Sequence, residues 1–316
     1  FLFGFATIFF VTQIYGLGLN RKLIIGSQIS FLLVVILVYS GLFTNYTFVD
    51  VNEVIRIPFI EYGLAFVFVY IIALPIFLNK RYNIPNWINK TSRILLYIIL
   101  GVSAISVMYV NSPYTPEPEM YEFIELNSNV TRSDTSKTIV LEPSTYENNI
   151  VFIPGGKVMP EAYLYLATEL ANEGMKVTII KPIANLAILQ PNLGSKYLEE
   201  DKTNIVMGHS LGGVVASMVV SKHPDVDYLV LLGSYNLGEI ESAETLIVSA
   251  EHDIQMDWNT YDENTTSIKN LTEVMIDGGN HAYFGYYGNQ RGDGQAEMSN
   301  KEQQDLVVGY ILAFLE

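Results

Sequence analysis

Apolar residues follow different patterns in the two parts of the chain. Before residue 110 they form long stretches without a charged residue, whereas beyond residue 120 short β-branched runs alternate with runs of helical periodicity. The uncharged stretches are Phe1–Leu19, Leu23–Phe43, Tyr62–Leu78 and Ile94–Val110. Each has 17 to 21 residues, the length that a helix needs to cross a bilayer. As buried helices of a globular core they would have no polar face for water, so residues 1–110 predict a four-helix transmembrane region.

Charges in the loops between these stretches predict the orientation of the region. The first loop carries Arg21 and Lys22, and the third loop, residues 79–93, carries four basic residues and no acidic one. The second loop, residues 44–61, has three acidic residues and one basic residue. Lys and Arg accumulate in cytoplasmic loops, so we expect a multi-pass cell-membrane protein whose part beyond residue 110 is extracytoplasmic. Because the chain begins with Phe1 and not with Met, we also expect its natural start to lie upstream.

The second part begins with a linker and continues with alternating strands and helices. Residues 111–119 contain three prolines, which favour an extended, semi-rigid tether. The runs expected as strands are Tyr121–Leu126, Thr138–Glu142, Asn149–Ile153, Lys176–Lys181, Asn204–Met207, Tyr228–Leu232, Thr245–Ser249 and Glu273–Ile276, and those expected as helices are Pro160–Glu173, Leu211–Ser221 and Lys301–Leu315. Buried strands alternating with helices indicate an α/β fold with a mostly parallel sheet over residues 120–316.

Composition supports this division and excludes several classes of protein. Half of the 316 residues are hydrophobic and 16% are charged, which is too apolar for an ordinary soluble protein. Residues 1–118 carry 7 basic and 4 acidic residues, and the other 198 carry 11 basic and 29 acidic ones. The overall net charge of −15 argues against nucleic-acid binding. The absence of cysteine from the sequence excludes disulfides, thiolate metal sites and a cysteine nucleophile, and we expect no cofactor and no metal.

One strand–helix junction carries a motif for nucleophilic catalysis. Gly208-His209-Ser210-Leu211-Gly212 follows an expected strand and precedes an expected helix. This is G-x-S-x-G in the context of a nucleophile elbow, a turn so sharp that side chains beside the serine would clash. We therefore expect Ser210 to be a nucleophile. A capping serine in a glycine-rich turn is the alternative interpretation.

A serine nucleophile needs a base, and the chain has four histidines, His209, His223, His252 and His281. Only His281 lies in a loop after a late strand, from which an imidazole can reach the serine, so we expect it to be the base. The acid that orients it should follow the preceding strand, which makes Asp253 the first choice. Asp257 and Glu251 remain as alternatives for that acid.

The reaction also needs two backbone amides that stabilise the negative charge on the substrate oxygen. The amide of Leu211, directly after the nucleophile, is one expected donor. The second is expected in the small-residue loop after strand Asn149–Ile153, at Gly156 or Lys157, between which the sequence does not decide.

Residues from about Tyr121 to Glu316 resemble the α/β-hydrolase superfamily, and within it the compact bacterial members similar to dienelactone hydrolases. The resemblance rests on the elbow, Asp253 and three further motifs, which are Phe152-Ile153-Pro154-Gly155-Gly156, Gly278-Gly279-Asn280-His281-Ala282-Tyr283-Phe284-Gly285 and Tyr287-Gly288-Asn289-Gln290-Arg291-Gly292-Asp293-Gly294. It implies an α/β-hydrolase fold and a cofactor-free Ser-Asp-His hydrolase. Dienelactone hydrolases use a cysteine nucleophile where this chain has Ser210, so their substrate is not carried over.

We therefore expect a membrane-anchored serine hydrolase that cleaves carboxylic esters at the extracytoplasmic membrane surface. Its expected partners are the lipid bilayer and a small or lipid-like ester, and the sequence leaves the question of protein partners open. Only 42 residues separate Ser210 from Asp253, too few for an inserted helical cap, so the site should be open. Its walls would include the aromatic residues of 283–287, unless these pack the loop. A non-catalytic membrane sensor or assembly protein and an acyltransferase with the same triad are the alternatives.

Overall fold

The structure, a computed structural model, describes residues 112–316 together with Trp87, Thr91 and Ile94. The chain divides into two compact units, Phe1–Leu96 and Tyr97–Glu316, and nearly all described residues belong to the second. The predicted transmembrane stretches, apart from Ile94, lie outside the described residues, as does Asn111 of the linker. In the part of the chain that the structure describes, every helix is too short or too polar to span a bilayer.

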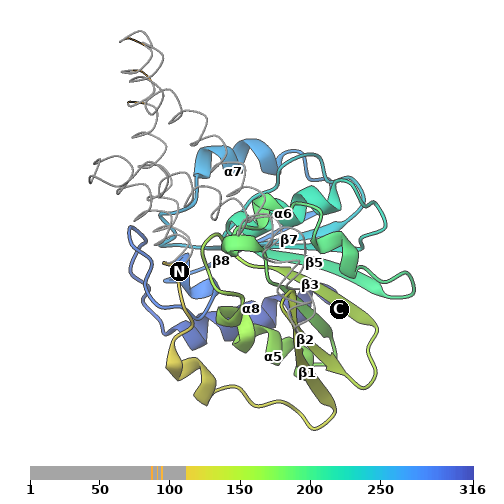
Figure 1. Cartoon of the computed structure of the whole chain (residues 1–316). Coiled ribbons are helices and arrows are strands. Elements are labelled where there is room, and N and C mark those ends of the chain that lie inside the picture. Colours follow the sequence, from red (N-terminus) through yellow and green to blue (C-terminus); the bar gives the residue numbers. More distant parts are fainter. Residues whose placement is uncertain (1–86, 88–90, 92–93, 95–111) are drawn as a thin grey trace, which may run out of the picture. The chain divides into compact units, whose positions relative to one another are not determined.

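An eight-stranded sheet forms the centre of the domain (Figure 1). The strands are β1 (Val130–Asp134), β2 (Thr138–Pro143), β3 (Asn148–Ile153), β4 (Lys176–Ile180), β5 (Thr203–His209), β6 (Tyr228–Leu232), β7 (Glu244–Ala250) and β8 (Leu271–Ile276). They lie in the order β1-β2-β4-β3-β5-β6-β7-β8. β3 to β8 are parallel to one another, whereas β2 is antiparallel to both β1 and β4. The expectation of a mostly parallel sheet is confirmed.

In the described domain, α-helices cover both faces of the sheet. Figure 1 shows α5 (Leu164–Asn172) and α8 (Asn300–Leu315) on one face, and α6 (Leu211–Val220) and α7 (Trp258–Thr265) on the other. Alternate side chains of each strand enter the two core clusters: in β5, Ile205 and Met207 pack on the α5 and α8 side and Val206 on the α6 and α7 side. The sheet is therefore buried on both faces. The remaining short elements are the 3-10 turns η1 (Pro118–Glu122), η2 (Pro160–Tyr163), η3 (Ile183–Asn185), η4 (Ala187–Leu189), η5 (Gly194–Tyr197) and η6 (Ala282–Phe284).

The ends of two predicted helices follow their sequence signals. The segment that opens with Pro160 is the 3-10 turn η2 continued by α5, and Gly174, with φ of 89°, follows its end. Ser299 and Glu302 form the predicted capping box of α8, each side chain accepting a hydrogen bond from the other's backbone amide.

The strand predicted over Tyr121–Leu126 is wrong. The chain there belongs partly to η1, and Phe123 and Ile124 pack against the core instead of pairing with a strand. The first strand is β1, in which only Val130 is buried, so its sequence lacks the apolar alternation that marks a strand. The sequence does not mark α7 either, because Tyr261 is its only buried residue.

The parallel strands place their carboxyl ends at one edge of the sheet. The loops that leave β3, β5, β6, β7 and β8 therefore gather there, and they carry all the candidate site residues. In open α/β sheets this is the edge at which ligands bind.

Candidate active site

Ser210 is the single residue between the last residue of β5 and the first residue of α6. Its backbone has φ of 53° and ψ of −128°, a conformation that residues other than glycine adopt only under strain. Two hydrogen bonds tie it to the end of β6 and the loop beyond: the Ser210 amide donates to the Leu232 carbonyl at 3.0 Å, and the Ser234 hydroxyl donates to the Ser210 carbonyl at 2.7 Å. The strained turn sets Ser210 at the carboxyl edge of the sheet.

The glycines of the motif are required by backbone proximity. A Cβ on Gly208 would lie 2.4 Å from the Gly212 carbonyl oxygen, and one on Gly212 would lie 2.2 Å from the Ile153 carbonyl oxygen. Neither backbone can move away without breaking the junction between β3, β5 and α6. Positions 208 and 212 therefore require glycine for steric reasons, as expected for a nucleophile elbow.

His281 and Asp253 form a buried pair at the same edge. The His281 Nδ1 atom lies 2.7 Å from Asp253 Oδ2, and the two residues are 3% and 2% exposed. The other carboxylate oxygen, Oδ1, accepts hydrogen bonds from the amides of Gln255 and Met256, both at 2.9 Å. The carboxylate is therefore fixed in place, and it fixes the ring orientation of His281, which leaves Nε2 for a second partner.

His281 packs directly against the elbow. Its ring centroid lies 4.7 Å from that of His209, and a Cβ on Gly233 would come within 3.1 Å of His281 Nδ1. Among the hydrogen bonds of the described residues, none joins the Ser210 hydroxyl to His281. Hydrogen bonds of this kind are often long or poorly aligned without substrate, so a further side-chain movement would be needed to form it.

The alternative acids have other roles. Asp257 is the N-cap of α7, and its carboxylate accepts from both the amide and the hydroxyl of Thr260. Glu251 accepts from the amide of Gly278 at 2.8 Å. Of the acids proposed from the sequence, Asp253 is the one bonded to His281.

Two of the other histidines lie at the surface beside acidic residues. His223 faces Asp225 at 4.0 Å, and His252 Nε2 lies 3.3 Å from Glu297. Neither contact involves the elbow, so His281 is the histidine whose partner and position suit a base for Ser210.

The structure distinguishes between the two candidates for the second oxyanion amide. The Lys157 amide donates to the Asn185 carbonyl at 2.8 Å, so it is already occupied. The amides of Gly156 and Leu211 take part in none of the hydrogen bonds found among the described residues. A Cβ on Gly156 would lie 3.1 Å from Cδ2 and 3.5 Å from Cβ of Leu211, so the Gly156 loop packs against the first residue of α6. The geometry therefore favours Gly156 and Leu211 as the pair of donors.

A buried tyrosine and His209 link this loop to the elbow. The Tyr163 hydroxyl accepts from the Gly155 amide at 2.9 Å and lies 2.8 Å from His209 Nδ1. The tautomer of His209 sets which of the two atoms donates, and its buried Nε2 has no hydrogen-bond partner among the described residues. Burial and then the nearby charge of His281 hold the pKa of His209 well below its usual value. Nothing in the sequence connects Tyr163 with the elbow, 46 residues away.

Asp293 connects the loops that carry the acid and the base. Its Oδ2 atom accepts from the amide of Ala282, the residue after His281, at 2.9 Å. Its Oδ1 atom accepts from the amide of Ile254, the residue after Asp253, at 3.4 Å. The carboxylate therefore fixes the two loops relative to each other. In the sequence Asp293 is only one residue of a glycine-rich tail.

Gln303 of α8 fixes the residue before the base. Fully buried, it accepts from the Asn280 amide at 3.0 Å and donates to the Asn280 carbonyl at 2.8 Å. The Asn280 side chain in turn donates to the Gly294 carbonyl. The amide and the carbonyl of Asn280 are thus both bonded to a side chain of α8. Like the contacts of Asp293, these bonds cannot be recognised in the sequence.

The aromatic residues after His281 are mainly packing residues. Phe284, Tyr286 and Tyr287 are buried in the core cluster, while Tyr283 is partly buried against it. Burial raises the pKa of Tyr287 well above its usual value. Of the two interpretations from the sequence, packing of the loop fits these three side chains.

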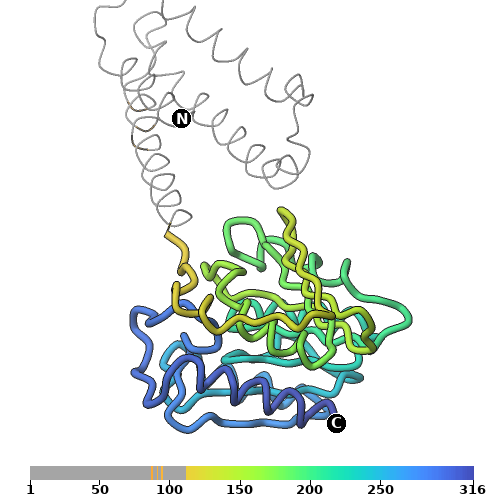
Figure 2. The backbone as a smooth tube through the Cα atoms, turned by 90° about the horizontal axis from the view of Figure 1, so that it is seen from below, coloured from red at the N-terminus to blue at the C-terminus, as the bar shows by residue number. Residues whose placement is uncertain are grey.

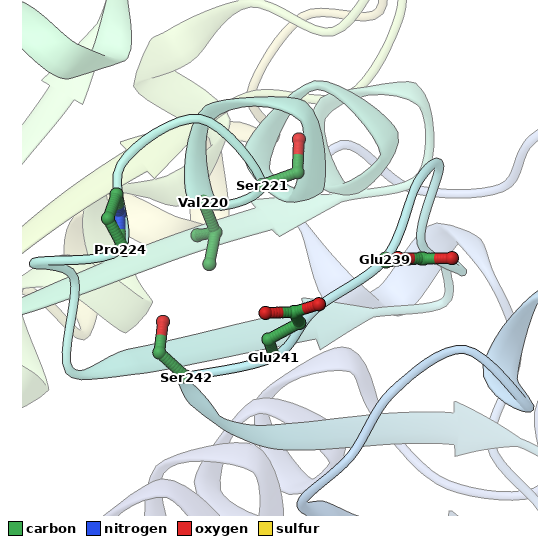
Figure 3. Close-up of a pocket in the computed structure, with 6 residues that line it drawn as sticks. All are labelled: Val220, Ser221, Pro224, Glu239, Glu241 and Ser242. Atoms are coloured by element: carbon green, nitrogen blue, oxygen red, sulfur yellow. The ribbon is translucent and has the colours of Figure 1, made fainter.

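The loop between β6 and β7 holds no α-helix, in agreement with the short spacing in the sequence. The hollow shown in Figure 3 lies elsewhere, at the amino ends of these strands, and is lined by Val220, Ser221, Pro224, Glu239, Glu241 and Ser242. In the part of the chain that the structure covers, no cluster of His, Asp and Glu side chains is suited to holding a metal ion.

Residues 149–305 match the model of the alpha/beta hydrolase family. The domain therefore has the α/β-hydrolase fold. The matched segment of this α/β hydrolase contains the elbow, both members of the Asp253–His281 pair and the two open amides. Residues 112–148 lie outside it.

Solved structures similar to the chain include two hydrolases. One is a dienelactone hydrolase from Anabaena variabilis, with 13% identity and a TM-score of 0.45, and the match covers 58% of this chain and 98% of that one. The other is described as a predicted CIB-like hydrolase from Thermoplasma acidophilum. It has 15% identity and a TM-score of 0.41, and the match covers 58% of this chain and 97% of that one. No curated protein matches the chain in sequence.

Proposed function

We propose that this α/β hydrolase is a membrane-anchored serine hydrolase that cleaves carboxylic esters at the extracytoplasmic membrane surface. The observation that carries the proposal is the buried Asp253–His281 pair packed against the elbow of Ser210. The two unoccupied amides of Gly156 and Leu211 on the same edge supply the remaining element of acyl-transfer chemistry.

The first half-reaction would form an acyl-enzyme. The Ser210 oxygen attacks the ester carbonyl while His281 Nε2 takes its proton, and the amides of Gly156 and Leu211 stabilise the negative oxygen that develops. Asp253 stabilises the imidazolium through the 2.7 Å contact to Nδ1. The carbon–oxygen bond to the alcohol then breaks, and His281 returns the proton to the leaving alkoxide.

The second half-reaction would regenerate the enzyme. Water replaces the alcohol, His281 removes a proton from it, and the hydroxide attacks the acyl carbon. Collapse of the second tetrahedral intermediate breaks the bond to Ser210, which recovers its proton from His281. If an alcohol takes the place of water, the same residues perform acyl transfer, and the product distinguishes the two.

Two features support an ester at the membrane as the substrate. The loop between β6 and β7 carries no helical cap, so no inserted helix covers this part of the carboxyl edge. The last predicted transmembrane stretch ends at Val110, and the four residues from there to Tyr114 span at most about 14 Å of chain. Tyr114 pairs with the loop that holds Gly156, so an anchored domain would keep its site near lipid-like esters.

A fluorophosphonate probe tests the catalytic part of the proposal. The full chain in detergent should be labelled at Ser210 and should release alcohol from p-nitrophenyl esters, while Ser210→Ala should do neither. Unlabelled wild type, or equal labelling of Ser210→Ala, would favour the non-catalytic sensor or assembly protein. Turnover confined to soluble short esters, with none of diacylglycerol in vesicles, would remove the lipid-like substrate.

The cysteine-free sequence allows a direct test of the anchoring. A Glu263→Cys variant places one thiol on the exposed side of α7. The protein should stay in the membrane fraction after alkaline extraction, and a membrane-impermeant maleimide should label this thiol on intact cells. Labelling only after permeabilisation would reverse the proposed orientation, and extraction into the alkaline supernatant would refute the anchor.

A further inference from the structure

The segment that enters the hydrolase domain is bonded to the loop that holds Gly156. Tyr114 forms a parallel bridge with Val158: its amide donates to the Lys157 carbonyl at 2.8 Å, and its carbonyl accepts from the Met159 amide at 2.9 Å. In Figure 2 this segment begins the coloured part of the trace. The residues that the sequence predicts to be a tether are therefore paired with the candidate oxyanion loop.

Further contacts hold the same segment on the loop that follows His281. The Glu117 amide donates to the Tyr286 carbonyl at 2.9 Å, and the Tyr114 ring lies 5.3 Å from that of Tyr287. Met120 is fully buried in the core cluster. Residues 114–120 thus belong to the packed domain, although they lie outside the segment that the family model matches.

The loop that this segment contacts has a strained conformation. The Gly155 carbonyl accepts from the Val158 amide at 3.2 Å, which closes a four-residue turn around Gly156 and Lys157. Lys157 has φ of 65°, a conformation that costs a residue other than glycine about 1–2 kcal/mol. Such a turn persists only where neighbouring groups hold it.

Those groups come from two directions. The Lys157 amide is held by the Asn185 carbonyl, and the Lys157 carbonyl is held by the Tyr114 amide. The residue after the turn, Met159, is held by the Tyr114 carbonyl. Removing the Tyr114 contacts would let Lys157 relax from its positive φ, and the neighbouring Gly156 amide would turn with it.

We propose that Tyr114 is a positioning residue for the oxyanion hole: its backbone holds the turn in the geometry that presents the Gly156 amide to the substrate. This inference rests on the proposed function, because it concerns the amide that would stabilise the oxyanion. It makes turnover depend on the chain segment that leads out of the N-terminal region.

Proline substitution in the full chain tests the inference. Tyr114→Pro removes both the ring and the amide hydrogen, whereas Tyr114→Ala removes the ring alone, so their difference isolates the bond to Lys157. Thr115→Pro is the matched control, since the Thr115 amide takes part in no hydrogen bond found among the described residues. We expect kcat for a p-nitrophenyl ester to be at least about tenfold lower in Tyr114→Pro than in Tyr114→Ala, with KM within about twofold, because an oxyanion donor acts in the transition state.

Hydrogen–deuterium exchange supplies a readout that does not depend on activity. Exchange in residues 154–159 should rise in Tyr114→Pro and stay at the wild-type level in Thr115→Pro. Equal kcat in Tyr114→Pro and Tyr114→Ala, or unchanged exchange, would overturn the inference and leave the proposed function standing. Wild type without Ser210-dependent turnover would instead overturn the proposed function, and with it the catalytic meaning of the bond.

Discussion

The Tyr163 hydroxyl is the most informative single group to remove. It lies in a fully buried ring and is bonded to the Gly155 amide and to His209 Nδ1. Tyr163→Phe would leave both partners buried and unpaired. Each such loss costs about 1–3 kcal/mol, so the two together should destabilise the domain by roughly 2–6 kcal/mol.

The consequence for heat stability follows from the size of the domain. For 150–250 residues, 1 kcal/mol corresponds to about 2–4 °C, so Tm should fall by at least roughly 4 °C. Gly155 also loses one of the bonds that hold it next to Gly156, and we expect kcat to fall about tenfold because an oxyanion donor is misplaced. Thermal unfolding followed by circular dichroism, together with ester hydrolysis, measures both effects on the full chain.

Tyr165→Phe is the matched control. Tyr165 is also buried and donates to Asp305, but this acceptor is exposed and keeps its 2.7 Å contact to Lys301, so no buried partner is left unpaired when the hydroxyl is lost. Its Tm should stay within about 2 °C of wild type, since a hydrogen bond at a hydrated site contributes about 1 kcal/mol or less. If Tyr163→Phe is no less stable than Tyr165→Phe, the link between the oxyanion loop and His209 has no energetic importance.

Three further predictions concern the other polar groups of the site. Asp253→Asn should lower kcat by a factor of about 10³–10⁴ with little change in KM, because His281 loses the group that fixes its tautomer. Steady-state kinetics measure this, and a loss of less than about tenfold in kcat would contradict the assignment. Asp293→Ala should lower both Tm and kcat, whereas Asp262→Ala on exposed α7 should change neither, and equal behaviour of the two variants would refute the coupling of the loops. The pKa of His209 in the folded state lies below its unfolded value of about 6.5. The stability that the neutral imidazole contributes is therefore complete above about pH 6.5 and is lost as the pH falls, by up to about 1.4 kcal/mol per pH unit. Tm measured from pH 7.5 to 5 should therefore decline more steeply in wild type than in His209→Gln, and parallel curves would show that His209 is not the group responsible.

The sequence was informative wherever local chemistry decides the structure. The buried strands β3 to β7 and the helices α5, α6 and α8 follow from apolar runs with the right period and from their end signals, such as Pro160 and the Ser299–Glu302 capping box. The steric need for glycine at Gly208 and Gly212 is equally local. By contrast, β1 and α7 each bury a single residue, so neither has a pattern to detect.

The candidate site shows the same division between local and long-range information. Residue type and order selected Ser210, His281 and a short list of acids. The order of the strands also made Asp253 the first choice of acid. Excluding Asp257 and Glu251 needs the structure, which shows which carboxylate meets an imidazole 28 residues away and which caps a helix or a loop. Spacing along the chain does not specify such distances.

The α/β architecture, the sharp turn at Ser210 and the residue types around it can be inferred from the amino-acid order, because each of these depends on neighbouring residues and their period. The folded chain is needed to see that the amide of Gly156 is open, that the amide of Lys157 is occupied, and that Tyr114 and Tyr163 hold the same loop. This is because an amide is free or bonded according to the acceptor that folding brings to it. Those acceptors come from parts of the chain between 8 and 45 residues away, where no local pattern records them.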